Sequence, residues 1–217
     1  MILAVDTALG ACSVALYDGH AVRAHICEPM DRGHAERLAP MVDEAMRQAD
    51  MPFAALDRLA VTTGPGTFTG QRVGLAFMRG LRLALHVPLT GVTTLDAMAM
   101  AAMAETGMPR AAAIHDARRD EAYLLLRDGE HVHLPPAVVP FREAIARIAD
   151  FGPCALAGTG AAAVHQALGD HALSAVRQPD ARWVARLALT LPVTDDAPGP
   201  LYLRAPDAKL PGGKTLV

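Results

Sequence analysis

The sequence predicts an α/β protein of two lobes, each built on a mixed sheet flanked by helices, with the second lobe a duplicate of the first. Two observations predict this fold. Residues 2–6 and 112–116 are short, mainly apolar segments that end in aspartate, and each is followed by a second strand-like segment and an Asp-Gly pair. In both halves these segments lead into alternating helices and strands, which is typical of α/β proteins. We therefore expect lobes at residues 1–107 and 108–217.

The repeat keeps its register across two turns. The offset that places Asp6 on Asp116 also places Asp18-Gly19 on Asp128-Gly129 without a gap. Asp-Gly pairs flanked by strand-forming residues are typical of β-hairpin turns. Short apolar strands can resemble one another by chance, but a register shared across both turns favours duplication.

The first half is expected to begin with a three-strand meander over residues 2–27. Apolar residues at helical spacing predict a helix after it, and Thr94 is a suitable N-cap for the last helix of this half. The expected elements after the meander are a helix over 33–49, a strand over 59–63, a helix over 70–86, a short strand over 89–92 and a helix from 94 to about 105.

The second half is expected to repeat this theme, beginning with a meander over residues 111–134. Trp183 is a large apolar residue in the last predicted helix, and we expect it to anchor the second core. The expected elements after the meander are a helix over 141–150, a strand over 154–158, and helices over 160–169 and 181–190.

Composition narrows the class of protein. The 217 residues are 52% hydrophobic and only 4% aromatic, so alanine, leucine, valine and methionine must build the core. A net charge of −3 argues against a nucleic-acid binder that acts alone through a basic stripe. Cys12, Cys27 and Cys154 are too few and too far apart for a disulfide framework or a paired-cysteine metal site. No uncharged apolar run reaches transmembrane length, so we expect a cytoplasmic protein in a reducing compartment.

The segment at 64–74, GPGTFTGQRVG, joins a predicted strand to a predicted helix. Glycine permits positive φ and close backbone approach, and the free N–H groups at a helix start attract anions. The segment lacks the Gly-Lys-Ser/Thr end of a Walker A loop, and its glycines do not have the spacing of the dinucleotide fingerprint. It is therefore either a phosphate cradle or a tight turn that lets the helix pack closely, with Thr67 or Thr69 as the helix cap. The lack of a basic anchor favours the turn.

Several segments together resemble the TsaB (YeaZ) family. The resemblance covers nearly the whole chain, and the glycine segment and the DARR segment are its most specific parts. The segments are ILAVDTALGACSVALY at 2–17, HAERL at 34–38, GPGTFTGQRVGLA at 64–76, GVTTLDAMA at 91–99, DARRDEAY at 116–123 and PLYLR at 200–204. The resemblance implies the actin/Hsp70-like fold and a type 1 dimerization subunit of the machinery that makes threonylcarbamoyladenosine in bacterial tRNA.

The resemblance also implies partners. Members of the family pair with the catalytic subunit TsaD and act with the ATPase TsaE, and they form a homodimer when alone. Together the proteins place a threonylcarbamoyl group on N6 of the adenosine beside the anticodon, in tRNAs that read codons beginning with A. Contact with tRNA is implied only through the complex, and neither a cofactor nor a membrane is implied.

One local difference separates this chain from the catalytic relative. TsaD carries a segment like GVNHLEAH, whose two histidines bind a metal. The same segment here is GVTTLDAM, with Thr94 and Met98 at those positions. A hydroxyl and a thioether do not replace two imidazoles for a hard or borderline divalent metal. His131 and His133 alternate along a predicted strand, but no third ligand is close in sequence, so we expect a non-catalytic subunit without a metal.

Asp6 and Asp116 end the first strand of each half, where members of the superfamily place acidic residues that face a nucleotide. They can hold a magnesium ion, or each can cap its strand-to-turn junction. The possible vestigial nucleotide or phosphate site comprises Asp6, Thr7, Gly64, Gly66, Gly70 and Asp116. The alternative function is an autonomous, nucleotide-using enzyme of the sugar-kinase type, against which the lack of a lysine in 64–74 weighs.

Two helices of the first lobe carry apolar residues that are either core or an interface. One lobe has a limited area of sheet to cover, so we expect part of this surface to be an exposed patch for a partner. Methionine suits adaptable interfaces, and the resemblance places the partner contact on these helices. The expected interface residues are Leu38, Met41, Val42, Ala45, Met46, Leu75, Met78 and Leu81.

Overall fold

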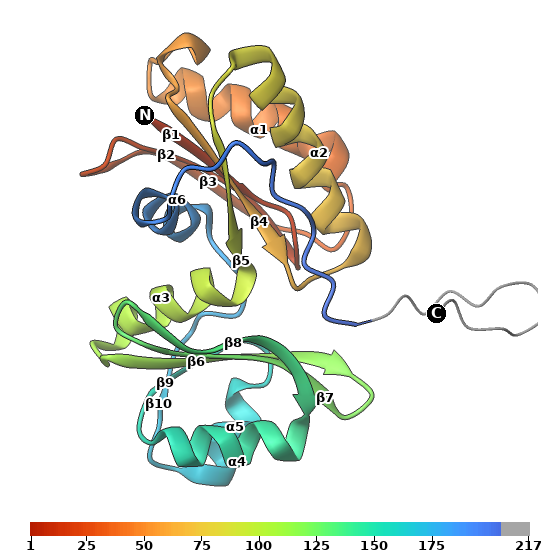
Figure 1. Cartoon of the computed structure of the whole chain (residues 1–217), viewed down its shortest axis with the longest axis vertical. Coiled ribbons are helices and arrows are strands. Elements are labelled where there is room, and N and C mark those ends of the chain that lie inside the picture. Colours follow the sequence, from red (N-terminus) through yellow and green to blue (C-terminus); the bar gives the residue numbers. More distant parts are fainter. Residues whose placement is uncertain (205–217) are drawn as a thin grey trace, which may run out of the picture.

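The computed structural model describes residues 1–204 and confirms two mixed five-stranded sheets (Figure 1). The first sheet has the order β3-β2-β1-β4-β5 and the second has the order β8-β7-β6-β9-β10. In both sheets the first strand pairs antiparallel with the second and parallel with the fourth. The strands of the first sheet are β1 (Ile2–Asp6), β2 (Ala11–Tyr17), β3 (Val22–Pro29), β4 (Arg58–Gly64) and β5 (Leu89–Thr93). Those of the second are β6 (Arg110–Arg118), β7 (Glu121–Asp128), β8 (His131–Pro140), β9 (Ala155–Ala157) and β10 (Ala172–Leu173).

The helices repeat in the same way. In each half, one helix follows the third strand, one follows the fourth and one follows the fifth, so the duplication extends over the whole topology. The helices of the first half are α1 (His34–Gln48), α2 (Phe68–Leu85) and α3 (Thr94–Thr106), with a short 3₁₀ turn at Phe53–Ala55. Those of the second half are α4 (Phe141–Phe151), α5 (Ala161–Leu168) and α6 (Ala181–Thr190).

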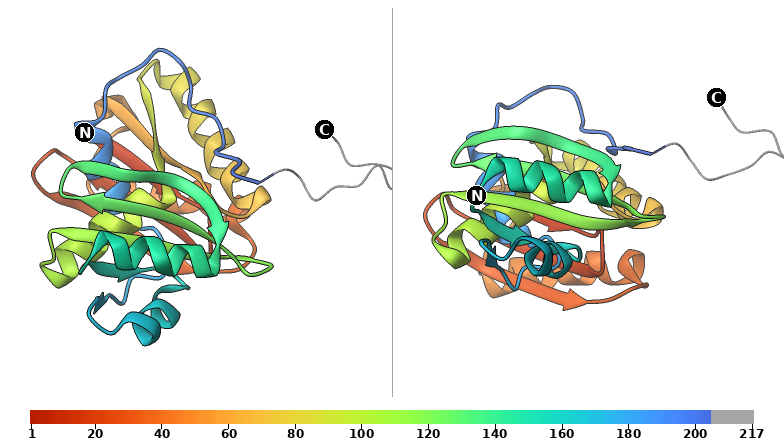
Figure 2. Two further views of the ribbon diagram at one scale, coloured as in Figure 1. Left: turned by 60° about the horizontal axis from the view of Figure 1, so that its bottom comes forward. Right: turned by 90° about the horizontal axis from the view of Figure 1, so that it is seen from below.

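The two halves exchange their last helices. Helices α1 and α2 cover the outer face of the first sheet, α4 and α5 cover the outer face of the second, and α3 and α6 lie between the sheets (Figures 1 and 2). Helix α3 follows the first sheet but packs on β6, β7 and β9 of the second, while α6 packs on β1 and β2 of the first. The expectation that 181–190 belongs with the second lobe is therefore wrong. Trp183 packs beside Ile2 and Ala4 in the first lobe, because the small residues on α6 let it approach that sheet closely.

The core depends on small side chains. Helix α3 is buried on almost every side, with the side chains of Leu95, Met98 and Ala102 inaccessible to solvent. A helix that is apolar all round is typical of such a position between two layers. Its sequence, TLDAMAMAAMAET, supplies alanine and methionine where two sheets must approach one helix.

Most predicted boundaries agree with the structure to within a few residues, and the exceptions have local causes. Helix α2 begins at Phe68 rather than 70, because Thr67 is its N-cap and accepts a hydrogen bond from the backbone N–H of Gly70 at 3.1 Å. Thr93, not Thr94, caps α3. The two-residue strand β10 was not expected from the sequence. Among residues 1–204, no helix is long and apolar enough to cross a membrane.

Candidate functional site

The glycine loop after β4 is filled by the chain itself. A Cβ atom at Gly66 would lie 2.4 Å from the carbonyl oxygen of Ala8, and one at Gly70 would lie 2.2 Å from that of Thr7. The N–H of Thr67 donates to the carbonyl of Ala8 at 2.8 Å. Gly64 has a φ of +112° and lies against the side chain of Gln71. These contacts favour the interpretation of a tight turn that packs against the turn after β1.

Thr7 fastens the turn after β1 to helix α2. Its Oγ1 donates to the carbonyl of Gly70 at 2.7 Å and accepts from the N–H of Gly74 at 3.0 Å. In an α-helix these two backbone groups would bond to each other, so the hydroxyl is inserted into the helical ladder. A Cβ atom at Gly74 would lie 2.7 Å from this hydroxyl. Thr7 is thus a structural clamp that needs a glycine opposite it.

The two aspartates do not share a site. Asp6 is fully buried, and its Oδ1 accepts hydrogen bonds from Thr62 Oγ1 at 2.5 Å and from the N–H of Ala8 at 3.1 Å. Burial raises the pKa of the Asp6 carboxyl to about 7. Asp116 is exposed, and its Oδ1 accepts from the N–H of Arg118 at 2.7 Å. Each carboxylate accepts a hydrogen bond from the backbone N–H two residues later, and Asp6 is inaccessible to solvent whereas Asp116 is exposed.

An interlobe cleft of about 640 Å³ lies beside Asp116, but not beside Asp6. Its walls come from the glycine loop, from the adjoining ends of β6 and β7 and from residues 201–204. Two buried polar atoms in its walls, Gln71 Oε1 and His115 Nδ1, have no hydrogen-bond partner among residues 1–204. Burial lowers the pKa of His115, so this imidazole favours its neutral form.

Residues 191–204, which we call the strap, run along α2 and end on the second lobe (Figure 1). Three arginines of α2 hold the strap: Arg82 donates to the Asp195 carbonyl, Arg79 to the Pro198 carbonyl at 2.7 Å, and Arg72 to Tyr202 Oη at 2.8 Å. The strap then crosses the cleft, where Arg204 donates to the Ala117 carbonyl at 2.8 Å and pairs with Glu121. The strap was not predicted from the sequence, although the three arginines lie at helical spacing.

Thr94 and Met98 are structural residues in this chain. Both are fully buried, and Thr94 Oγ1 donates to the carbonyl of Pro65 at 2.7 Å, which ties α3 to the glycine loop. Met98 packs between α3 and the second sheet, and its Cε would lie 3.3 Å from a Cβ atom at Gly158. At the two positions compared with the TsaD histidines, this chain therefore has a hydrogen bond to backbone and a core contact.

The expected interface residues lie in the core of the single chain. All of them except Leu81 are buried, and Leu81 packs against the same core. The prediction that they form an exposed patch is wrong, because the apolar stripes of α1 and α2 are the faces that cover the first sheet. The buried residues are Leu38, Met41, Val42, Ala45, Met46, Leu75 and Met78.

A different apolar surface is open on the same two helices. The first-lobe groove, of about 500 Å³, lies between α1 and α2. Phe68, at the start of α2, is 55% exposed, and the guanidinium of Arg72 lies 3.4 Å from its ring centroid. The groove is lined by Ala35, Leu38, Phe68, Thr69, Arg72, Val73, Ala76 and Phe77. Such a surface suits contact with another protein better than it suits a reaction.

Comparison with known proteins identifies the family. The family model "TsaD: tRNA N6-adenosine threonylcarbamoyltransferase" matches residues 26–153. The tRNA threonylcarbamoyladenosine biosynthesis protein TsaB of Escherichia coli K12 is 42% identical over 122 residues, which are 56% of this chain and 52% of that protein. The match to that relative thus spans about half of its length.

Solved structures match over almost the full chain. YeaZ from Pseudomonas aeruginosa is 33% identical with a TM-score of 0.78, covering 93% of this chain and 99% of that one. A second P. aeruginosa structure, described as similar to peptidase YeaZ, is 32% identical with a TM-score of 0.83, covering 94% of this chain and 99% of that one. The chain therefore belongs to the TsaB (YeaZ) family and has its duplicated, actin/Hsp70-like fold.

Proposed function

We propose that this chain is a non-catalytic subunit of the complex that forms N6-threonylcarbamoyladenosine in tRNA next to the anticodon. It pairs with TsaD, activates that subunit, and works together with the ATPase TsaE. The names of its relatives support a role in the biosynthesis of threonylcarbamoyladenosine in tRNA. The main support for a non-catalytic role is that Thr94 and Met98 are fully buried and make structural contacts.

The first-lobe groove is the surface that we propose for the TsaD contact and, when the chain is alone, for a homodimer. It lies on the helices to which the family resemblance assigns the contact, but its exposed residues differ from those first predicted. Phe68 is an exposed aromatic side chain in it, and Ala76 is a small exposed residue that allows close approach. Aromatic residues are common anchors at protein interfaces.

The alternative, a nucleotide-using kinase-like enzyme, finds little support in the geometry. Backbone of the turn after β1 packs closely against Gly66 and Gly70, and Asp6 is fully buried. The strap contributes Leu201 to Arg204 to the wall of the interlobe cleft. We propose that tRNA meets this subunit only through the complex, and that the chain acts in the cytoplasm with that complex.

Reconstitution tests this function directly. The purified chain, TsaD and TsaE are mixed with tRNA and the threonylcarbamoyl donor, and each protein is omitted in turn. We expect transfer only when TsaD is present, and a large loss when this chain is left out. Turnover by this chain alone would contradict the non-catalytic role, and full transfer by TsaD and TsaE without it would contradict the activating role. Titration with ATP tests the kinase alternative, for which we expect no saturable binding to the isolated chain.

A further inference from the structure

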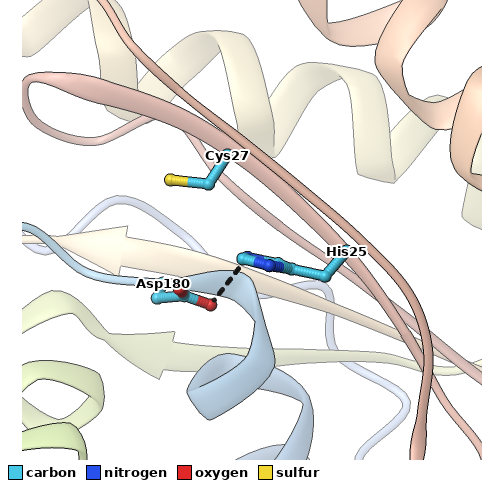
Figure 3. Close-up of side chains that lie close together, drawn as sticks. All are labelled: His25, Cys27 and Asp180. Carbon is cyan, nitrogen blue, oxygen red and sulfur yellow. Dashed lines mark ion pairs between the residues drawn. The ribbon is translucent and has the colours of Figure 1, made fainter.

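One cluster of side chains has metal-ligand chemistry and lies away from the cleft and the groove. His25 and Cys27 alternate on the edge strand β3, so their side chains leave the same face of the sheet. Asp180, the N-cap of α6, meets them there (Figure 3). One imidazole nitrogen, the thiol sulfur and one carboxylate oxygen all lie within 4.8 Å of one another.

The nitrogen donor has no hydrogen-bond partner in the described part of the chain, whereas Oδ1 of Asp180 already accepts from the backbone N–H of Arg182 at 2.8 Å. Nε2 of His25 is buried and has no hydrogen bond of good geometry among residues 1–204, although it lies 3.1 Å from Oδ1 of Asp180. A carboxylate oxygen and the unprotonated nitrogen of a neutral imidazole each have a lone pair to offer a cation.

Cys27 supplies the third donor. A divalent metal binds cysteine as the thiolate, and the thiol proton is released to solvent on binding. Cys27 is exposed as a whole residue, so its side of the cluster faces solvent.

We infer that His25, Cys27 and Asp180 form a binding site for a zinc-type divalent cation. Nitrogen, sulfur and oxygen donors together are the ligand set of zinc, whereas magnesium and calcium prefer oxygen alone. The metal ties an edge strand of the first half to the last helix of the chain. This differs from the metal-free protein expected from the sequence, in which Asp180 is too distant from the His-x-Cys pair to be noticed.

Arg182 sets the strength of this site. Its Nε and Nη2 lie 3.0 and 2.7 Å from the two carboxylate oxygens of Asp180, so the guanidinium competes with a cation for the same ligand. The positive end of α6 also opposes a cation. We therefore expect weaker binding than at a structural site with four ligands, and tighter binding once the competing arginine is removed.

The test uses the full chain, stripped of metal with a chelator and then titrated with Zn²⁺ by calorimetry and with Co²⁺ by absorption spectroscopy. We expect one saturable site and a thiolate-to-cobalt charge-transfer band. Cys27→Ser should abolish the band and weaken zinc binding at least about tenfold, and His25→Gln should weaken it similarly. Arg182→Ala should tighten it several-fold. His133→Gln, which alters an exposed histidine on β8, should leave binding unchanged.

Two results would overturn the site. The first is the absence of saturable zinc binding by the wild-type chain. The second is zinc affinity that survives both Cys27→Ser and His25→Gln, since the metal would then be held elsewhere. Circular dichroism checks that each variant is folded, and if His25→Gln is not, the exposed Cys27→Ser substitution and the cobalt band decide the question.

Discussion

The two halves share one topology, but the turns that follow their first strands have opposite environments. Asp6 and Asp116 each accept a hydrogen bond from the N–H two residues later, yet Asp6 is fully buried and Asp116 is exposed at the cleft. The local hydrogen bond is the same because it depends only on neighbouring residues. The environment differs because it depends on the loop that follows the fourth strand of each half.

Those loops differ in what they pack against. In the first half, Gly66 and Gly70 press against the turn that follows Asp6. In the second half, a Cβ atom at Gly158 would lie 2.1 Å from the carbonyl of Ile114, which is inside strand β6 and ahead of Asp116. The second turn is therefore left open. In a duplicated fold, one copy of a turn can thus be buried and stabilising while the other copy stays accessible to solvent.

The largest expected effect comes from the buried carboxylate. The pKa of Asp6 in the folded chain is raised from 3.8 to about 7, so the folded state holds this proton more tightly than the unfolded state does. This difference makes its full contribution to the free energy of unfolding below pH 4. The contribution is lost as the pH rises to 7, which lowers the free energy of unfolding by up to about 4 kcal/mol. Asp6→Asn should remove that part of the pH dependence in denaturant unfolding followed from pH 4 to 8.

Asp116→Asn is the matched control, since it alters the equivalent residue of the other half. We expect it to leave the difference between pH 4 and pH 8 unchanged. Equal effects of the two substitutions would show that the two turns are not in different environments.

The next largest effect is at the glycine loop. Gly70→Val would place a Cβ atom 2.2 Å from the carbonyl of Thr7 and 2.6 Å from Thr67 Oγ1, so backbone must move. We expect a loss of about 3 kcal/mol in the free energy of unfolding, measured with urea. Gly80→Ala in the same helix meets nothing within 4 Å and should be neutral or slightly stabilising. A Gly70→Val variant as stable as wild type would disprove the packing of this loop.

A smaller effect is expected at the clamp. Thr7→Val keeps the shape of the side chain but removes both hydrogen bonds to α2, at a cost of about 1–2 kcal/mol. Thr69→Val alters an exposed threonine of the same helix and should change stability by less than about 0.5 kcal/mol. Thermal denaturation of the two variants side by side measures the difference, and equal melting temperatures would argue against the clamp.

The smallest effect on global stability is expected at the strap. Arg204→Ala removes the contacts to Ala117 and Glu121 that join the strap to the second lobe. We expect the free energy of unfolding to fall by less than about 1 kcal/mol, because the ion pair is partly exposed.

Hydrogen exchange in residues 199–204 should nevertheless become faster. Arg142→Ala, which alters an exposed arginine at the start of α4, should leave it unchanged. Unchanged exchange in the Arg204 variant would mean that the first lobe alone holds the strap, through α2 and through the hydrogen bond from the N–H of Leu201 to the carbonyl of Thr63 at 2.7 Å.

Much of the fold could be predicted from the sequence because local signals agree with it. The two meanders, their Asp-Gly turns and the helices after them were expected from spacing alone and are confirmed. The position of α6 could not be predicted, because nothing local in ARWVARLALT says which sheet it will cover. Its place in the second half of the chain led us to expect it in the second lobe, whereas packing between the sheets exchanges α3 and α6.

The candidate sites were harder to predict. The apolar face of α1 that contains Met41 is equally consistent with a core and with an interface. Whether it is buried depends on how much sheet surface the helix has to cover. Met41→Glu is therefore no test of an interface, since it would bury a charge in the core. The strap and the His25 cluster join residues that are far apart in the sequence, so one sequence without a structure does not reveal them.

The central claim, that the chain acts by docking its first-lobe groove on TsaD, is tested most directly by one pair of variants. Ala76→Glu adds a charge to an exposed position in the groove on α2, and Ala163→Glu adds the same charge to an exposed position on α5, the equivalent helix of the second half. TsaD capture is measured by titration, with circular dichroism as the check on folding. We predict that Ala76→Glu weakens capture at least about tenfold, a loss of about 1.4 kcal/mol, and that Ala163→Glu has no effect. A folded Ala76→Glu variant that captures TsaD as well as wild type does would contradict the account.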